Sequence, residues 1–366
     1  MSFLKILNNW ENFDFSDYLE KVDDKMVLDS LNKRVLDKFD FLNLLSPKAK
    51  NHIETLAQKA HDITVANFGY TINLYLPIYI SNYCSSDCLY CGFSKKNRIQ
   101  RRKLSLDEIE KEAKEIAKTG IKHILLLTGE SRSVTPVKYL VDAVKILKKS
   151  FSFVAIEVYP MSQEDYETLF KAGVDGLTVY QEVYDKEIYK AVHVSGEKSD
   201  FIYRLETPER GAKAGFRSIN IGALFGLGEI EKEAFFSGLH AKYLSDKYLG
   251  CELGLSLPRI NDAEGEFKPN HILEDAKFVQ IMCAYRIFLP RVEINISTRE
   301  DSAFRDNLLK ICATKFSAGS KTEVGGYTKA LTEPQFEISD TRQSDEVVKS
   351  IEKMGYEPVY KNWESI

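Results

Sequence analysis

The sequence of 366 residues lacks the features that mark several special classes of protein. It has no excess of one charge, with 50 Lys and Arg against 54 Asp and Glu, and so lacks the basic balance typical of nucleic-acid binding. No apolar run approaches the roughly 20 residues of a membrane helix. The N-terminus carries acidic residues where a signal peptide has its apolar core. We therefore expect a cytoplasmic protein without nucleic acid or membrane as partner.

Cysteine is also scarce. Six cysteines in a chain of this length are too few for a disulfide scaffold. Three of them, Cys251, Cys283 and Cys312, are scattered through apolar segments, where a free cysteine usually behaves as a small buried hydrophobic residue. The other three fall within the single segment Cys84–Cys91, and that clustering needs another explanation.

Short apolar runs alternate with amphipathic stretches from Thr71 onward. Continuous rather than alternating hydrophobicity suits strands that are buried on both faces. The runs are Leu74–Ser81, His123–Glu130, Phe153–Pro160, Gly176–Glu182, Ser218–Gly226, Cys251–Ile260, Val292–Thr298 and Lys315–Ser320. Helix-start signals lie between them, at Ser105 with Glu108, at Thr135-Pro136 and at Ser162. The pattern predicts an α/β fold, a (β/α)8 TIM-type barrel, whose weak eighth strand leaves full closure open.

The rest of the chain flanks this barrel. Residues 1–70 have helical spacing and predict an N-terminal helical extension, with helices at Phe41–Leu45 and Ala49–Phe68. Residues 71–325 form the predicted barrel. Residues 326–366 form a C-terminal segment packed on it, with one helix near Ser344–Met354.

Polar side chains follow the apolar runs at the strand ends, where barrels of this type place their chemistry. They include Glu130, Glu157, Tyr180, Gln181, Glu182, Gly222, Arg259, Arg299, Ser317 and Ser320. A single glutamate at such a place is most often a helix cap or a solvated loop residue. Charged groups after several apolar strands are costly unless they are paired or bound, so their convergence predicts a site for a polar ligand.

The spacing Cys84-x3-Cys88-x2-Cys91 is the strongest signal in the chain. Thiolates select soft metals, chiefly zinc, copper(I) and iron–sulfur clusters. Structural zinc commonly takes two separated ligand pairs, and a ferredoxin uses a fourth cysteine nearby; the sequence offers neither. Three thiolates with a vacant fourth position therefore suit a [4Fe–4S] cluster with one open iron.

The segment CSSDCLYC at 84–91 resembles the signature of the radical S-adenosylmethionine (SAM) enzymes, with an aromatic residue before the last cysteine. Flanking segments at 79–83, 92–94 and 127–130 are similar to the aromatic amino acid lyase branch. Later segments resemble the tyrosine lyases of thiamine biosynthesis, namely 296–300, 316–322, 335–338 and 358–363. The resemblance covers essentially the whole chain.

This resemblance implies that Cys84, Cys88 and Cys91 ligate three irons and that SAM binds the fourth through its amino and carboxylate groups. Further SAM contacts are implied as well. Gly129 and Glu130 would hold the methionine amino group, Arg204 the SAM carboxylate, and Tyr90 and Gly222 would lie near the adenine. On local sequence alone, Arg204 could equally be an exposed helical arginine.

For the substrate, Arg299 is the predicted partner of the tyrosine carboxylate, because a guanidinium binds a carboxylate bidentately. Arg259 is the second choice, and Ser317 or Ser320 would add a hydroxyl donor. Three neighbouring residues at the end of the fourth predicted strand are expected at the same open end of the barrel, namely Tyr180, Gln181 and Glu182. Whether each of them contacts SAM or the substrate stays open.

The implied reaction is cleavage of the Cα–Cβ bond of L-tyrosine to 2-iminoacetate (dehydroglycine) and p-cresol, which supplies the imine for the thiazole of thiamine. The implied partners are thiazole synthase and an external electron donor of the flavodoxin/NADPH type. The basic segment 95–103 is either a solvated loop or a docking patch for that donor. No cysteine follows Cys312, so we expect one cluster, without the second cluster of the related hydrogenase maturase.

Two alternatives stay open at this point. One is a related lyase acting on another aromatic amino acid, such as tryptophan. The other is a cluster- or zinc-binding partner subunit of thiazole synthase without catalysis. The presence of both Glu130 and Arg299 favours an enzyme.

Overall fold

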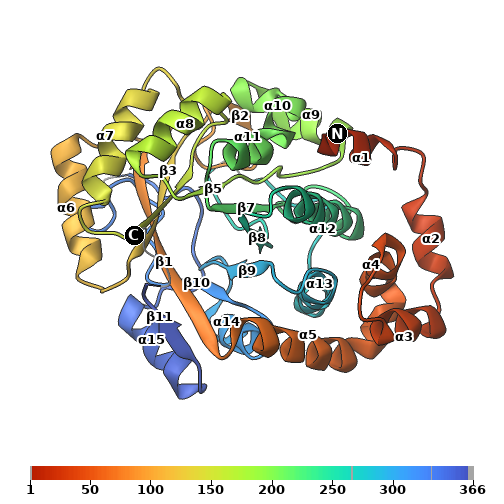
Figure 1. Ribbon diagram of the computed structural model, residues 1–366. Coiled ribbons are helices and arrows are strands. Elements are labelled where there is room, and N and C mark those ends of the chain that lie inside the picture. The colour runs from red at the N-terminus through yellow and green to blue at the C-terminus, as the bar shows by residue number, and fades with distance from the viewer. Residues whose placement is uncertain (1, 265–266, 331, 362–366) are drawn as a thin grey trace.

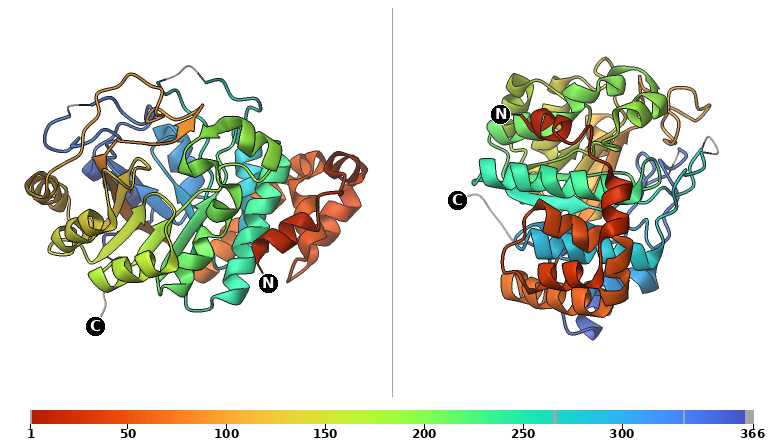
Figure 2. Two further views of the ribbon diagram at one scale, coloured as in Figure 1. Left: turned by 90° about the horizontal axis from the view of Figure 1, so that it is seen from above. Right: turned by 90° about the vertical axis from the view of Figure 1, so that its right-hand side faces the viewer.

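A closed ring of parallel strands forms the centre of the computed structural model, which describes residues 2–264, 267–330 and 332–361 (Figures 1 and 2). Each strand pairs in parallel with the next, and the last pairs with the first. The strands are β1 Thr71–Ser81, β3 His123–Thr128, β4 Phe153–Glu157, β5 Gly176–Thr178, β7 Ser218–Gly222, β8 Glu252–Ser256, β9 Glu293–Ile296 and β10 Lys315–Ser317. The predicted (β/α)8 barrel is confirmed, and the register Leu74↔Phe316 closes it.

Helices surround the ring, because their apolar faces cover the outward side chains of the strands. They are α6 Leu106–Ala117, α7 Val137–Leu147, α8 Gln163–Ala172, α9 Lys186–Val192, α10 Phe201–Leu205, α11 Thr207–Lys213, α12 Ile230–Lys247, α13 Asp275–Phe288 and α14 Ser302–Leu309. Ser105 and Ser162 cap α6 and α8 as predicted. The start predicted at Thr135 is wrong by one residue: Pro136 has extended backbone and serves as the N-cap of α7.

The N-terminal residues form a layer of helices on one side of the barrel (Figure 2). They are α1 Phe3–Asn8, α2 Phe15–Lys21, α3 Asp24–Asn32, α4 Lys38–Leu45, the 3-10 helix Pro47–His52 and α5 Ile53–Phe68. This layer packs on α12 and α13, with the Phe41 ring stacked 4.4 Å from that of Phe288. The single helix predicted over Ala49–Phe68 is in fact divided at His52, because Ser46-Pro47 opens a 3-10 helix first.

The C-terminal residues cross the barrel mouth and then return to its base. Helix α15 Ser344–Lys353 matches the helix predicted there, and β11 Glu357–Val359 pairs in parallel with the start of β1. Met1 and the end of the tail motif, Asn362 and Trp363, lie outside the described residues. The division into residues 1–70, 71–325 and 326–366 stays a prediction. In the described part of the chain, no helix has both the length and the apolarity needed to cross a membrane.

Candidate active site at the mouth of the barrel

One cavity runs from the interior of the barrel to the carboxyl ends of its strands. Most of the residues singled out in the sequence line it: Cys84, Cys88, Tyr90, Cys91, Gly129, Glu130, Tyr180, Glu182, Arg204, Arg299, Ser317 and Ser320. The parallel topology explains this convergence, since all strand ends meet at one face. Gln181, Gly222 and Arg259 were also predicted as site residues, but they are not part of this lining.

The three cysteines lie on the loop after β1, which we call the cysteine loop (residues 82–94). The short strand β2 Asp87–Cys88 pairs antiparallel with β6 His193–Ser195. Arg101 donates to the backbone carbonyls of Asn82 and Phe93 at 2.7 and 2.9 Å. The loop is therefore held from both sides before any cofactor binds.

The cysteine thiols are free and largely enclosed. Burial raises the pKa of Cys84 to about 11 and also raises the pKa values of Cys88 and Cys91. A buried thiolate needs a positive charge close by, and the irons of a cluster would supply it. Three thiols that share one cavity are a donor set that fits a [4Fe–4S] cluster. Within the described residues, no group of three or more His, Cys, Asp or Glu side chains is so arranged that it could hold a single metal ion.

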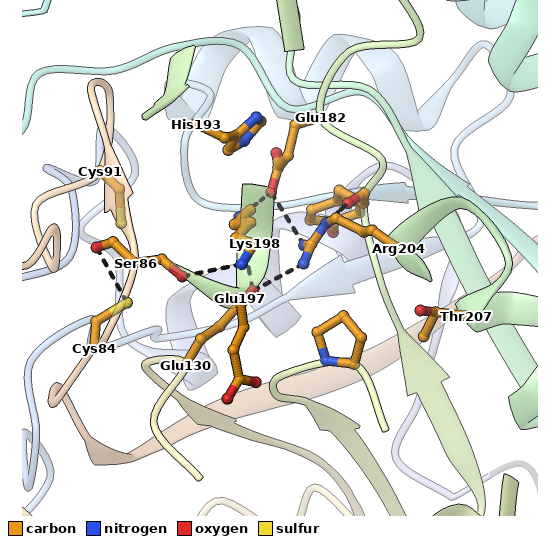
Figure 3. Close-up of polar contacts among 12 residues, drawn as sticks. Cys84, Ser86, Cys91, Glu130, Glu182, His193, Glu197, Lys198, Arg204 and Thr207 are labelled. Atoms are coloured by element: carbon orange, nitrogen blue, oxygen red, sulfur yellow. Dashed lines mark hydrogen bonds and ion pairs between the residues drawn. The ribbon is translucent and has the colours of Figure 1, made fainter. Parts of the chain in front are cut away.

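Four charged groups, three of them buried and Lys198 half-buried, form a network beside the cysteine loop (Figure 3). Arg204 on α10 donates to Glu130 at 2.8 Å and lies 3.4 Å from Glu182. Lys198 donates to Glu182 at 2.7 Å. Burial raises the pKa of Glu182, but Lys198 and Arg204 more than offset this, so its pKa is held below the usual value. Arg204 is therefore a buried partner of two carboxylates rather than an exposed helical arginine.

Glu130 keeps one carboxylate oxygen available. Its Oε2 atom is buried and has no hydrogen-bond partner among the described residues. The preceding Gly129 is required by close packing, because a Cβ there would lie 2.4 Å from the carbonyl oxygen of Tyr83 in the cysteine loop. A free carboxylate oxygen beside three thiols fits the amino group of SAM.

Glu182 is held in a strained backbone conformation. Its φ of 70° is positive, which no other described non-glycine residue shares. The carbonyl of Glu182 accepts a hydrogen bond from the backbone of Leu224 at 2.8 Å, which stabilises this conformation. Strain of this kind clusters at ligand-binding sites.

Tyr90 is fixed through a histidine. The Tyr90 hydroxyl lies 2.8 Å from Nε2 of His193, whose Nδ1 lies 2.8 Å from the carbonyl of Tyr189. Burial lowers the pKa of His193 to about 3, so this ring is neutral. Nδ1 must then carry the proton for the carbonyl, and Nε2 accepts from Tyr90.

Gly222 and Gln181 support the cavity wall from behind. The carbonyl of Gly222 accepts from the backbone of Gln181 at 3.0 Å. A Cβ at Gly222 would lie 2.4 Å from the carbonyl oxygen of Ser256, so the glycine allows the two strands to approach. Both residues act on the site through the backbone that they fix.

The two candidate substrate arginines have different environments. Arg299 lies over the Phe336 ring at 3.4 Å and makes no ion pair among the described residues. Burial lowers its pKa, which an anionic ligand would reverse. Arg259, in contrast, is bound to Glu300 and to Asp275, at 2.7 Å for the latter. Arg259 is thus already paired and does not line the cavity, whereas Arg299 lines it without an ion pair, so the geometry favours Arg299 for an anionic ligand and a substrate role for Arg259 stays a prediction.

The two serines also differ. The Ser317 hydroxyl accepts from the backbone of Thr298 at 3.1 Å. The Ser320 hydroxyl is buried without a hydrogen-bond partner in the described part of the chain. Ser320 is thus the serine whose hydroxyl is available to a ligand.

Sequence reasoning missed several lining residues, notably Tyr79, Lys198 and Gln335. Tyr79 donates to Gln335 at 2.8 Å, and Gln335 Nε2 lies 3.9 Å from the Cys91 sulfur. Gln335 belongs to the segment 335–338, whose resemblance to the family implies no role for this residue. Lys198 lies in a polar loop between helices, and no local signal distinguishes it from a solvated lysine.

Comparison with known proteins places this site in a family. Residues 78–236 match the Radical SAM superfamily, and residues 256–357 match the Biotin and Thiamin Synthesis associated domain. The chain is 36% identical over 363 residues to the 2-iminoacetate synthases of Salmonella typhimurium and Escherichia coli, covering 98% of this chain and 96% of each relative.

A solved structure agrees. The [FeFe]-hydrogenase maturase HydG superposes with a TM-score of 0.87 at 28% identity, covering 98% of this chain and 79% of that chain. The resemblance inferred from the cysteine spacing is thereby confirmed. This chain belongs to the radical SAM superfamily and, within it, to the 2-iminoacetate synthase family of carbon–carbon lyases of thiamine biosynthesis.

Proposed function

We propose that this enzyme cleaves the Cα–Cβ bond of L-tyrosine to give 2-iminoacetate and p-cresol. The observation that carries the proposal is Arg299, a guanidinium without an ion-pair partner among the described residues, in the same cavity as the three cysteines and Glu130. An amino acid carboxylate is the ligand that such a group binds well. The identity with 2-iminoacetate synthases supports the same conclusion.

Membership of the radical SAM superfamily implies a [4Fe–4S] cluster and SAM. We assign cluster ligation to Cys84, Cys88 and Cys91, and the amino and carboxylate groups of SAM to Glu130 and Arg204. When bound, these cofactors supply a 5′-deoxyadenosyl radical that can abstract a hydrogen atom from the substrate. We also assign Glu182 to the SAM side of the cavity, because Lys198 and Arg204, the latter assigned to SAM, are its ion-pair partners.

The protein itself orients the substrate and excludes water. Arg299 holds the substrate carboxylate and Ser320 donates its hydroxyl to it. Tyr79 and Tyr180 both line the cavity and offer aromatic surface for the side chain of the substrate. Exclusion of water matters because an imine hydrolyses and a carbon radical reacts with any nearby C–H bond.

An acidic electron donor of the flavodoxin type would dock beside the cysteine loop. Lys95, Lys96 and Arg98 are exposed there, whereas Arg101 and Arg102 are used within the fold. Steering by such charges weakens as salt rises. Thiazole synthase is the expected consumer of the imine, and the cytoplasmic location stays a prediction.

The test is anaerobic incubation of the reconstituted protein with SAM, dithionite and L-tyrosine, followed by chromatography. Formation of both 5′-deoxyadenosine and p-cresol supports the proposal. 5′-Deoxyadenosine without p-cresol would keep the radical chemistry and move the substrate to another aromatic amino acid, with L-tryptophan assayed next. Neither product, from protein that holds its cluster, would indicate a partner subunit without catalysis.

A further inference from the structure

Glu157 is a carboxyl group in the cavity that the site described above leaves unused. It is the last residue of β4 and lies beside Leu127 of the neighbouring strand β3. Its side chain lines the same cavity as Arg299. Within the described residues, the side chain of Glu157 makes no hydrogen bond or ion pair, unlike the side chains of Glu130 and Glu182. Such a group is costly in an enclosed place unless a ligand binds it.

The surroundings of Glu157 are charged on several sides. Glu182, Lys198, Arg204 and Arg299 act on it electrostatically. The negative charge of Glu157 in turn helps to raise the pKa values of three tyrosines that line the same cavity, Tyr75, Tyr79 and Tyr180. Glu182, Lys198 and Arg204 already neutralise one another. Arg299 and Glu157 are thus the two charged groups of the cavity that have no ion pair in the described chain.

An α-amino acid carries opposite charges on two atoms attached to one carbon. A site with one cation and one carboxylate on facing walls matches that zwitterion. We propose that Glu157 binds the amino group of the substrate while Arg299 binds its carboxylate, so that the pair selects α-amino acids. This inference rests on the proposed function and names the residue that recognises the amino group.

The ionisation of Glu157 adds a pH dependence. Burial, with the negative charge of Glu182, raises the pKa of Glu157 to about 7. The carboxyl is therefore protonated well below pH 7 and ionised above it, while the amino group of the substrate keeps its proton over most of this range. The preference for ligands that carry an amino group should rise between pH 6 and pH 8.

The experiment is calorimetric titration of the reconstituted enzyme with SAM and no reductant, so that no turnover occurs. Four ligands are compared: L-tyrosine, 3-(4-hydroxyphenyl)propanoate without the amino group, tyramine without the carboxylate, and L-phenylalanine without the phenol. The variants are Glu157→Gln, Glu157→Asp and, as a matched control, Glu293→Gln. Glu293 is a half-buried glutamate at the start of β9 that pairs with Lys315 and does not line the cavity.

We expect wild type to prefer L-tyrosine over the propanoate, and Glu157→Gln to lower this preference roughly 10- to 100-fold, as for loss of a charge-assisted hydrogen bond. Glu157→Asp should restore part of it, and Glu293→Gln should leave all four affinities unchanged. In wild type the preference should rise with pH, and in Glu157→Gln it should be flat. The wild-type pH series needs no variant to fold.

Several results would overturn the inference. Glu157→Gln could instead change the ratio of L-tyrosine to L-phenylalanine, which would place Glu157 at the phenol. It could lower the affinity for SAM alone, which would assign it to the cofactor. An unchanged preference, or one that does not vary with pH in wild type, would also refute it. If wild-type enzyme binds none of the four ligands, the proposed function itself fails and this inference fails with it.

Discussion

Replacement of Arg204 by methionine tests the buried charge network most directly. The change keeps an apolar side chain about as long as the aliphatic stem of arginine, and it leaves Glu130 and Glu182 with Lys198 as their shared cation, 4.0 and 2.7 Å away. Removal of one partner from a buried ion pair typically costs about 3–5 kcal/mol. With an entropy of unfolding of about 2.1 cal/mol/K per residue, this lowers the melting temperature of a chain of this size by roughly 4–6 °C.

The loss should depend on pH in a defined direction. In wild type the pKa of Glu182 is lowered, so its contribution to stability is present above the unfolded pKa and is lost as pH falls through the folded pKa. Without Arg204 the pKa of Glu182 should rise above the unfolded value, and the variant then loses stability as pH increases. The difference between the two proteins should therefore be larger near pH 7.5 than near pH 5, because the wild-type contribution is still present at pH 5 while the destabilisation of the variant grows with pH.

The melting temperatures of wild type and of Arg204→Met are measured by differential scanning fluorimetry. The full cluster-free chain is used, under reducing conditions, at both pH values. The control is Arg217→Met, which removes a partly exposed pair with Glu252. Surface pairs contribute about 0–1 kcal/mol, so its melting temperature should fall by roughly 1 °C or less at either pH. A loss for Arg204→Met that is equal at both pH values, or no larger than that of the control, would refute the electrostatic reasoning.

Three further predictions concern the cofactor and substrate groups. Cys88→Ala should abolish the iron content and violet-end absorption of reconstituted protein, whereas Cys251→Ala should keep both. Gly129→Ala should weaken SAM binding, measured by equilibrium dialysis, because its Cβ would lie 2.4 Å from a backbone oxygen of the cysteine loop; Gly250→Ala has open space and should bind normally. Arg299→Gln should lower the affinity for L-tyrosine roughly 10- to 100-fold by calorimetry, and an unchanged affinity would contradict its role.

Much of this protein could be predicted from local pattern. Strands buried on both faces must be apolar along their whole length, so Leu74–Ser81 and the seven other runs marked the ring of the barrel. Ser105 and Glu108 marked the start of α6, because capping needs side chains at fixed spacing. The three cysteines revealed the chemistry, since thiols so close in sequence must share one loop.

Tertiary structure alone decided which charged groups are partners. The sequence ranked Arg299 above Arg259 for the substrate, but only the fold shows that Glu300 and Asp275 pair with Arg259. The sequence does not distinguish Lys198 from a solvated loop lysine, and only the fold places it next to Glu182. Periodicity in a sequence records whether a position is buried, because burial follows from the geometry of one helix or strand. The partner of a buried charge comes from another strand far along the chain, and only closure of the barrel brings the two together.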